Sequence, residues 1–100
     1  MNNIEQEPIN IIDEKAKRFA SICQELSDLY KRKNHDYGDS FSKSIKKYGP
    51  IAGLTRISDK FSRLESLILN KDREVLDESV QDTLKDMASY CIMLSMENEM

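Results

Sequence analysis

The sequence predicts an all-α fold: a compact helical domain of three long helices and one short helix that assembles as a helical homo-oligomer. Apolar residues recur at spacings of three and four along extended stretches, which is the period of an amphipathic helix. No stretch of useful length alternates apolar and polar residues as a strand does. The 100 residues include only 3 Gly and 2 Pro and no Trp, a composition that favours helices over turns.

Residues 1–9 are mostly polar and are predicted to form a flexible N-terminal arm, whereas residues 10–97 are predicted to form a single domain. The first long helix is expected from about Asn10 or Asp13 to Arg32, with acidic residues near its start and basic residues at its end, as the helix dipole favours. Its apolar positions follow one another at helical spacing and are predicted to form one buried stripe. They are Ile12, Ala16, Phe19, Cys23, Leu26 and Tyr30.

A short helix is expected from Phe41 to Tyr48, with Ser40 as its cap and with Gly49 and Pro50 ending it. Phe41, Ile45 and Tyr48 would share one side of this helix. A third helix should then cover about Ile51 to Leu69. Its predicted buried stripe consists of Leu54, Ile57, Phe61, Leu64 and Ile68.

The turn at residues 70–72 leads to a last helix that Asp77 is expected to cap and that reaches about Met96. The predicted inner face of this helix consists of Val80, Leu84, Met87, Cys91 and Leu94. Because Cys23 and Cys91 fall on apolar faces and lack the spacing of a metal site, they are interpreted as small buried hydrophobes.

Composition and charge exclude several classes of protein. The net charge is −3 and the pI is near 5.2, whereas a general binder of duplex nucleic acid presents a strongly basic face. The sequence contains no signal-peptide pattern and no apolar run of bilayer length, so a cytoplasmic protein without a membrane partner is expected. With 39% apolar and 33% charged residues the core must be thin, which favours a homo-oligomer, a dimer or a tetramer.

The segment 33–41 carries an unusual variety of functional groups. It combines the only histidine, a Tyr-Gly pair, a Lys-Asn pair and two carboxylates. From Lys31 to Lys47 six cations stand against two carboxylates, a balance that suits a small anionic ligand, although a solvated turn is the alternative. His35 is also a candidate base, or simply a hydrogen-bonding surface residue. The candidate binding residues of this junction are Lys33, Asn34, His35, Asp36, Tyr37, Gly38 and Phe41.

The third and last helices add further candidates on their polar faces, namely Arg56, Asp59, Lys60, Arg63, Asp82 and Asp86. Two arginines seven residues apart share a helix face and could hold phosphate with their forked donors, or they could pair with the two aspartates between helices or between subunits. Asp82 and Asp86 are a weaker alternative for a Mg²⁺ site, together with Glu25 and Asp28 across a subunit interface. No Ser or Cys nucleophile with a supporting triad is evident, so no catalytic residue is assigned.

Three motif blocks occur in order along the chain: Lys33-Asn34-x-Asp36-Tyr37-Gly38, Arg56-Ile57-x-Asp59-Lys60-x-x-Arg63-Leu64, and Asp77-Glu78-Ser79-x-x-Asp82-Thr83-Leu84-x-Asp86-x-Ala88-x-Tyr90, with Gly49 between the first two. Together they resemble the phage "nucleotide modification associated" domain family, a domain of unknown function. The resemblance implies a small all-helical protein that phages encode near genes of nucleotide metabolism. The last block is also distantly similar to the acidic helix of MazG-type all-α nucleotide pyrophosphatases. The chain departs from their Glu-x-x-Glu and Glu-x-x-Asp metal helices, because it has Glu25-x-x-Asp28 and Asp82-x-x-x-Asp86.

These observations lead to the hypothesis of a non-catalytic nucleotide sponge without a cofactor, which sequesters a nucleotide immune signal such as a cyclic dinucleotide in the host cytoplasm. Tyr37 or Phe41 would stack on the base, Asn34 and Asp36 would read its edge, and Lys33, Arg56, Lys60 or Arg63 would hold phosphate. One alternative is a Mg²⁺-dependent nucleotide phosphohydrolase or an accessory factor in base modification, with Asp82 and Asp86 as metal ligands. Another is a helical module that binds only protein.

Overall fold

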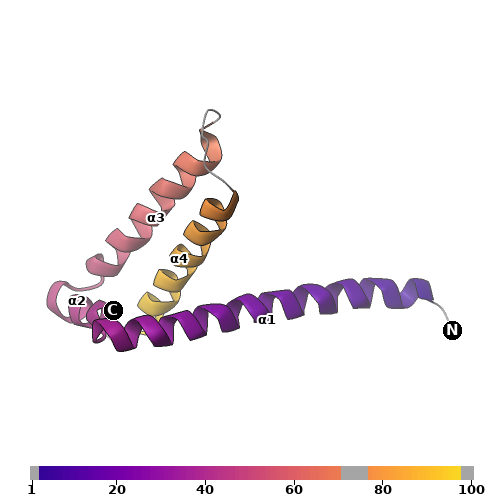
Figure 1. The fold of residues 1–100 in the computed structure, drawn as a ribbon, viewed down its shortest axis with the longest axis horizontal. Coiled ribbons are helices and arrows are strands. Elements are labelled where there is room, and N and C mark those ends of the chain that lie inside the picture. Colours follow the sequence, from indigo (N-terminus) through magenta and orange to yellow (C-terminus); the bar gives the residue numbers. More distant parts are fainter. Residues whose placement is uncertain (1–2, 71–76, 98–100) are drawn as a thin grey trace. The chain divides into compact units, whose positions relative to one another are not determined.

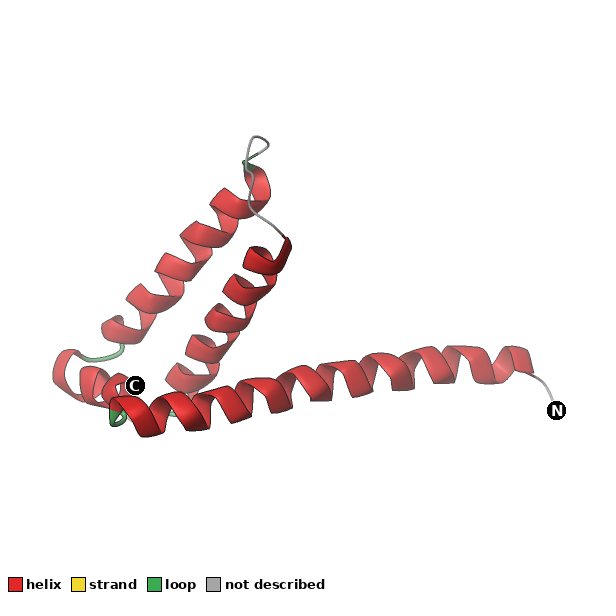
Figure 2. Cartoon of the chain, in the orientation of Figure 1, coloured by secondary structure: helices red, strands yellow, loops and turns green. Residues whose placement is uncertain are grey.

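The computed structural model describes the backbone of residues 3–70 and 77–97 and the side chains of residues 10–70 and 79–97. In this part of the chain the regular structure is entirely helical, which confirms the all-α part of the prediction (Figures 1 and 2). Its four helices are α1 (Asn3–Tyr37), α2 (Ser40–Tyr48), α3 (Ile51–Leu69) and α4 (Asp77–Ser95). Over the described residues, no helix has the length and apolar character needed to cross a membrane.

The chain divides into two compact units, residues 1–33 and residues 34–100. The first unit consists of α1 as far as Lys33, and its predicted apolar stripe includes exposed residues: Ile12 is 65% exposed and Phe19 73% exposed. Cys23 is a free, exposed cysteine, so the interpretation of this thiol as a buried hydrophobe is wrong within the chain. The apolar period is present as predicted, but a stripe is buried only where another element covers it.

Helix α1 extends beyond both ends that the sequence predicts. It begins at Asn3, within the segment predicted to be an arm, and ends at Tyr37 instead of Arg32. The apolar period stops at Tyr30, but no helix breaker follows before Gly38, which has φ +61°. The Asp39 N–H donates to the Asn34 carbonyl oxygen at 3.3 Å, the bond of a Schellman motif with glycine at C′. The junction is therefore mostly the last turn of α1 and not a loop.

Helix α2 begins one residue earlier than predicted, so Ser40 is helical and is not the cap. Asp39 occupies the cap position in the left-handed region (φ 60°, ψ 39°) and makes no side-chain capping hydrogen bond. Phe41 and Ile45, one turn apart, are buried at 7% and 1% exposure, whereas Tyr48 is 63% exposed and is not part of the predicted buried side. Gly49 ends the helix with φ +84° and donates its N–H to the Ile45 carbonyl oxygen at 2.7 Å.

Helices α3 and α4 lie side by side and form the core of the second unit together with α2 (Figure 1). The predicted stripe of α3 is partly wrong, because Leu54, Phe61 and Ile68 are 54%, 48% and 54% exposed. Ile57 and Leu64 are half-buried, as predicted, but the inward side otherwise follows neighbouring positions of the helix. Its buried and half-buried members are Gly53, Ile57, Lys60, Leu64 and Leu67.

Gly53 accounts for the side of α3 that faces inward. A Cβ atom on Gly53 would lie 2.7 Å from Leu94 Cδ1 and 3.2 Å from Phe41 Cζ, so α3 approaches its neighbours through the missing side chain. Helix α3 has apolar residues at buried and at exposed positions, and the apolar pattern alone does not distinguish them. The close approach at Gly53 turns this side of α3 inward and leaves Leu54, Phe61 and Ile68 exposed.

The predicted inner face of α4 is partly right, because Val80, Met87 and Leu94 are half-buried, but the inward side also includes Thr83. Thr83 is only 3% exposed and donates its Oγ1 proton to the Ser79 carbonyl oxygen at 2.7 Å, which satisfies the hydroxyl without a partner from another helix. Leu84 is 38% exposed, and Cys91 is a free, exposed cysteine, so its predicted burial is wrong. The half-buried residues Met87, Tyr90 and Leu94 continue the face that Thr83 begins.

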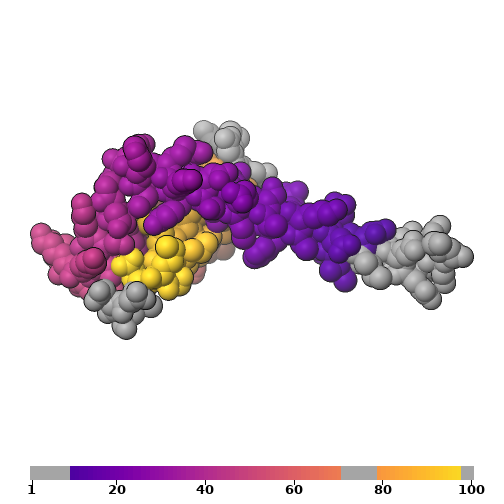
Figure 3. Space-filling view, turned by 90° about the horizontal axis from the view of Figure 1, so that it is seen from below, coloured from indigo at the N-terminus to yellow at the C-terminus, as the bar shows by residue number. Residues whose placement is uncertain are grey.

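The second unit is also joined where α2 meets the end of α4. The Ser42 hydroxyl donates to Glu97 Oε2 at 2.7 Å, and in the space-filling view the surfaces of these two segments adjoin (Figure 3). The predicted turn at residues 70–72 lies mostly outside the described residues, as does the side chain of Asp77, the first residue of α4.

Candidate ligand-binding surface

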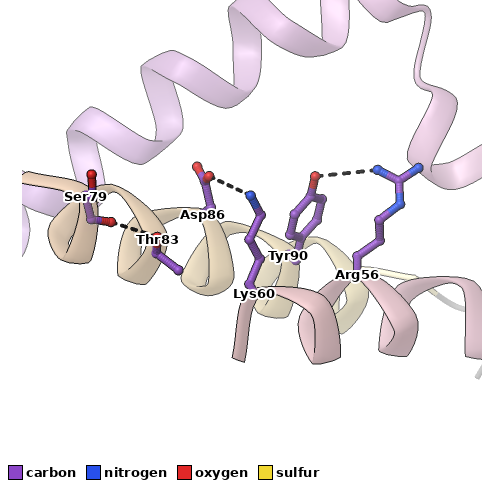
Figure 4. A network of polar contacts seen from close by, with 6 residues as sticks. All are labelled: Arg56, Lys60, Ser79, Thr83, Asp86 and Tyr90. Atoms are coloured by element: carbon purple, nitrogen blue, oxygen red, sulfur yellow. Dashed lines mark hydrogen bonds and ion pairs between the residues drawn. The ribbon is translucent and has the colours of Figure 1, made fainter. Parts of the chain in front are cut away.

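A row of polar contacts joins α3 to α4 in the second unit (Figure 4). Lys60 Nζ lies 3.0 Å from Asp86 Oδ2, and these two side chains are 29% and 38% exposed. One turn earlier on α3, Arg56 Nη1 donates to the Tyr90 hydroxyl at 3.5 Å, and the guanidinium carbon lies 5.8 Å from the centroid of the Tyr90 ring. Two cations on one side of α3 are therefore held against α4 at defined positions.

The pairing of these cations differs from the sequence expectation of arginine–aspartate pairs. Within the chain, Asp86 pairs with Lys60, and Arg56 contacts the neutral Tyr90 instead. Among the described residues, no carboxylate lies within ion-pair distance of Arg56 or Arg63, and the exposed Asp59 and Asp82 enter no ion pair. The guanidinium of Arg56 is thus oriented by an aromatic ring while its charge is not neutralised by a carboxylate from that part of the chain.

The orientation of Tyr90 depends on Phe41. The two rings stack with centroids 6.0 Å apart and an interplanar angle of 23°. Because Phe41 is only 7% exposed, its ring is part of the core and presents no free face on which a base could stack. Its contribution to the surface is indirect, since it supports the tyrosine that contacts Arg56.

Of the junction residues, Phe41 contacts a member of this row, whereas no hydrogen bond or ion pair between described residues joins residues 34–38 to it. His35 Nδ1 and Asp36 Oδ1 are 3.4 Å apart, but their side chains are 89% and 71% exposed. Tyr37 is 69% exposed as well. Asn34 and Gly38 form the C-terminal turn of α1, so backbone geometry accounts for this glycine. Lys33 is exposed and belongs to the first unit. Of the grouped residues, Lys33, His35, Asp36 and Tyr37 are therefore exposed to solvent, whereas Asn34 is half-buried and Phe41 is buried.

A groove between α2 and α3 includes residues that sequence reasoning missed. It has a volume of about 390 Å³ and is lined by Ser44, Tyr48, Ile51, Ala52, Thr55 and Arg56. Of these six, only Arg56 was a candidate from the sequence, and no junction residue lines the groove. One sequence signal was available: from Ser40 to Ser58 the chain has four cations, Lys43, Lys46, Lys47 and Arg56, and no carboxylate.

Metal coordination was considered for the two aspartates of α4. Over the described residues, no group of three or more His, Cys, Asp or Glu side chains is arranged to hold a metal ion. Asp86 is directed toward Lys60, and Asp82 is exposed. On α1, Asp28 accepts a hydrogen bond from Gln24 Nε2 at 2.9 Å. The arrangement of Asp86 is that of an ion-pair partner.

Comparison with known proteins adds the family. The model of "Nucleotide modification associated domain 1" matches residues 33–97, which is well over half of the chain. The chain belongs to this family. The match agrees with the resemblance carried by the three motif blocks, whereas the likeness to MazG-type pyrophosphatases is not confirmed. Searches of curated proteins and of solved structures each found no significant match. The family region nearly coincides with the second unit, so most of α1 lies outside it.

Proposed function

We propose that this protein is a phage-encoded nucleotide binder that holds its ligand intact, acting as a sponge for a nucleotide immune signal such as a cyclic dinucleotide. The family association with nucleotide modification supports the ligand class. The observation that carries the proposal is Arg56, which Tyr90 positions while, among the described residues, no carboxylate neutralises it. A guanidinium in this state has its charge and its forked donors available for phosphate.

The surrounding charges support binding without cleavage. Arg56, Lys60 and Arg63 follow one another at spacings of four and three and so lie along one side of α3. A nucleotide held there would meet Arg56 and Lys60, which contact α4, and the exposed Arg63. Asp86 is engaged by Lys60 and neutralises that cation, while the exposed Asp59 neighbours the row along α3 and enters no ion pair with a described residue. The charge available to phosphate is therefore that of Arg56 and Arg63.

Self-association is part of the proposal. The exposed apolar residues Ile12 and Phe19 of α1 and Leu54, Phe61 and Ile68 of α3 follow one another at intervals of seven within each helix, a spacing suited to helix–helix contact. A second copy of the chain, with the same surfaces, would cover them in a symmetric homo-oligomer. Native mass spectrometry of freshly lysed material gives the subunit number and any co-purified ligand in one measurement.

The test of function is incubation of the full chain with ATP, GTP, cyclic di-AMP and cyclic di-GMP, with and without Mg²⁺, followed by denaturation and chromatography. A sponge returns the bound nucleotide unchanged. Formation of products would identify the Mg²⁺-dependent phosphohydrolase, with Asp82 and Asp86 as the first residues to test. No binding to any nucleotide would favour a helical module that binds protein.

A charge variant makes this test specific. Arg56→Gln removes a charge-assisted hydrogen bond and should weaken nucleotide binding roughly 10- to 100-fold. Arg18→Gln removes the same charge from an exposed position of α1 and should leave the affinity within about twofold, as expected of a screened surface charge. Equal effects of the two variants would mean that net charge alone drives the interaction.

A further inference from the structure

The groove between α2 and α3 is an open depression in the surface, with a volume of about 390 Å³. A ligand lying in it would keep part of its own surface exposed to solvent. Gly49 and Pro50 connect the two helices directly, and the positive φ of Gly49 sets the turn between them. The walls of the groove therefore come from two helices joined by a short, defined turn.

The lining of the groove combines the groups that a nucleotide requires. Tyr48 presents an aromatic ring that is 63% exposed, and Ile51, 56% exposed, adds an aliphatic surface beside it. Thr55 donates its hydroxyl proton to the Ala52 carbonyl oxygen at 2.9 Å, which leaves the Oγ1 lone pairs able to accept a hydrogen bond from a base edge. A flat apolar wall beside hydroxyl groups matches a heterocyclic base.

Cations stand next to this wall. Lys47 Nζ lies 5.3 Å from the centroid of the Tyr48 ring, and Arg56 lines the groove itself. The segment from Ser40 to Ser58 carries four cations and no carboxylate, although the whole chain has a net charge of −3. A local positive field of this kind attracts the phosphate group of a nucleotide. The base of the same nucleotide would then lie close enough to stack on the Tyr48 ring.

We propose that the α2–α3 groove is the base-binding subsite, in which the base stacks on Tyr48 and the phosphate is held by Arg56 and Lys47. This inference rests on the proposed nucleotide-binding function and moves the base from the junction to a groove that the sequence analysis did not identify. Arg56 belongs both to the groove and to the row of contacts between α3 and α4, because it lines the groove and also contacts Tyr90 of α4. One arginine thus links the base subsite to the cation row of α3.

The experiment measures affinity by calorimetry for ATP, GTP, cyclic di-AMP and cyclic di-GMP, with wild type, Tyr48→Ala, Tyr48→Phe and Tyr37→Ala. Loss of one stacking platform should weaken binding about 5- to 150-fold in Tyr48→Ala. Tyr48→Phe keeps the ring and should bind within about threefold of wild type. Because Tyr48 is mostly exposed, its truncation should leave the helical circular dichroism unchanged.

The outcomes separate the two proposals. If wild type binds none of the four nucleotides, the proposed function itself fails. If wild type binds and Tyr48→Ala binds equally well, the groove is refuted while the function stands, and a loss in Tyr37→Ala would return the base to the junction. Amide chemical-shift changes provide an independent readout: with a bound nucleotide they should centre on Ser44, Thr55 and Arg56, and a centre at residues 34–38 would overturn the inference.

Discussion

Substitution of Gly53 by alanine tests the packing that decides which side of α3 is buried. The new Cβ would lie 2.7 Å from Leu94 Cδ1 and 3.2 Å from Phe41 Cζ, closer than ordinary van der Waals contact. Overpacking of this kind costs about 1–3 kcal/mol. Alanine also gains about 1 kcal/mol over glycine in a helix interior. The net expectation is a loss of up to about 2 kcal/mol in the free energy of unfolding.

The assay is urea denaturation followed by circular dichroism at 222 nm, repeated at two protein concentrations because self-association would contribute to stability. Ser62 provides the calibration, since it is exposed on the same helix. The difference between Ser62→Ala and Ser62→Gly measures the helix propensity alone and should favour alanine by about 1 kcal/mol. At position 53 the protein with glycine should instead be more stable than the protein with alanine.

Truncation of Leu94 should remove most of the steric clash with a Cβ atom at position 53. On a Leu94→Ala background, Gly53→Ala should be neutral or stabilising by up to about 1 kcal/mol, so the double-mutant cycle should show a favourable coupling of about 1–2 kcal/mol. If Gly53→Ala stabilises the protein with Leu94 intact, by as much as the Ser62 pair indicates, then α3 and α4 do not approach each other through this glycine.

Three further predictions concern two turns and an ion pair. Gly49→Ala should cost about 1–3 kcal/mol of stability in the same urea assay, because φ +84° with ψ −175° is a conformation that side chains avoid even though nothing lies within 4 Å of the new Cβ. Gly38→Asn should cost less than Gly38→Ala, since asparagine tolerates the left-handed region, and equal losses would argue against that turn. A double-mutant cycle with Lys60→Met and Asp86→Asn should give a coupling of about 0.2–1 kcal/mol, which decreases as NaCl is raised. A coupling that does not respond to salt would contradict a partly exposed pair.

The junction shows the limit of sequence reasoning about sites. His35, Asp36 and Tyr37 were grouped because diverse functional groups stood close together along the chain. The last turn of α1 places such neighbours on different sides of a helix, and all three side chains are exposed. The groove residues Ser44, Tyr48 and Thr55 were not grouped, because only the turn at Gly49 brings α2 and α3 together. Local proximity in sequence and proximity in space are different properties.

The sequence by itself determined the fold class, the four helices and the family, because helical period, turn residues and motif spacing are local properties. It placed α3 at residues 51–69, as observed, and it found the cations of that helix. The tertiary structure decided which residues of α3 face inward, that Lys60 and not an arginine pairs with Asp86, and that Phe41 lies in the core against Tyr90. These features depend on close packing between helices, which the sequence pattern does not show. At Gly53 the absence of a side chain allows Leu94 and Phe41 to lie against the backbone of α3.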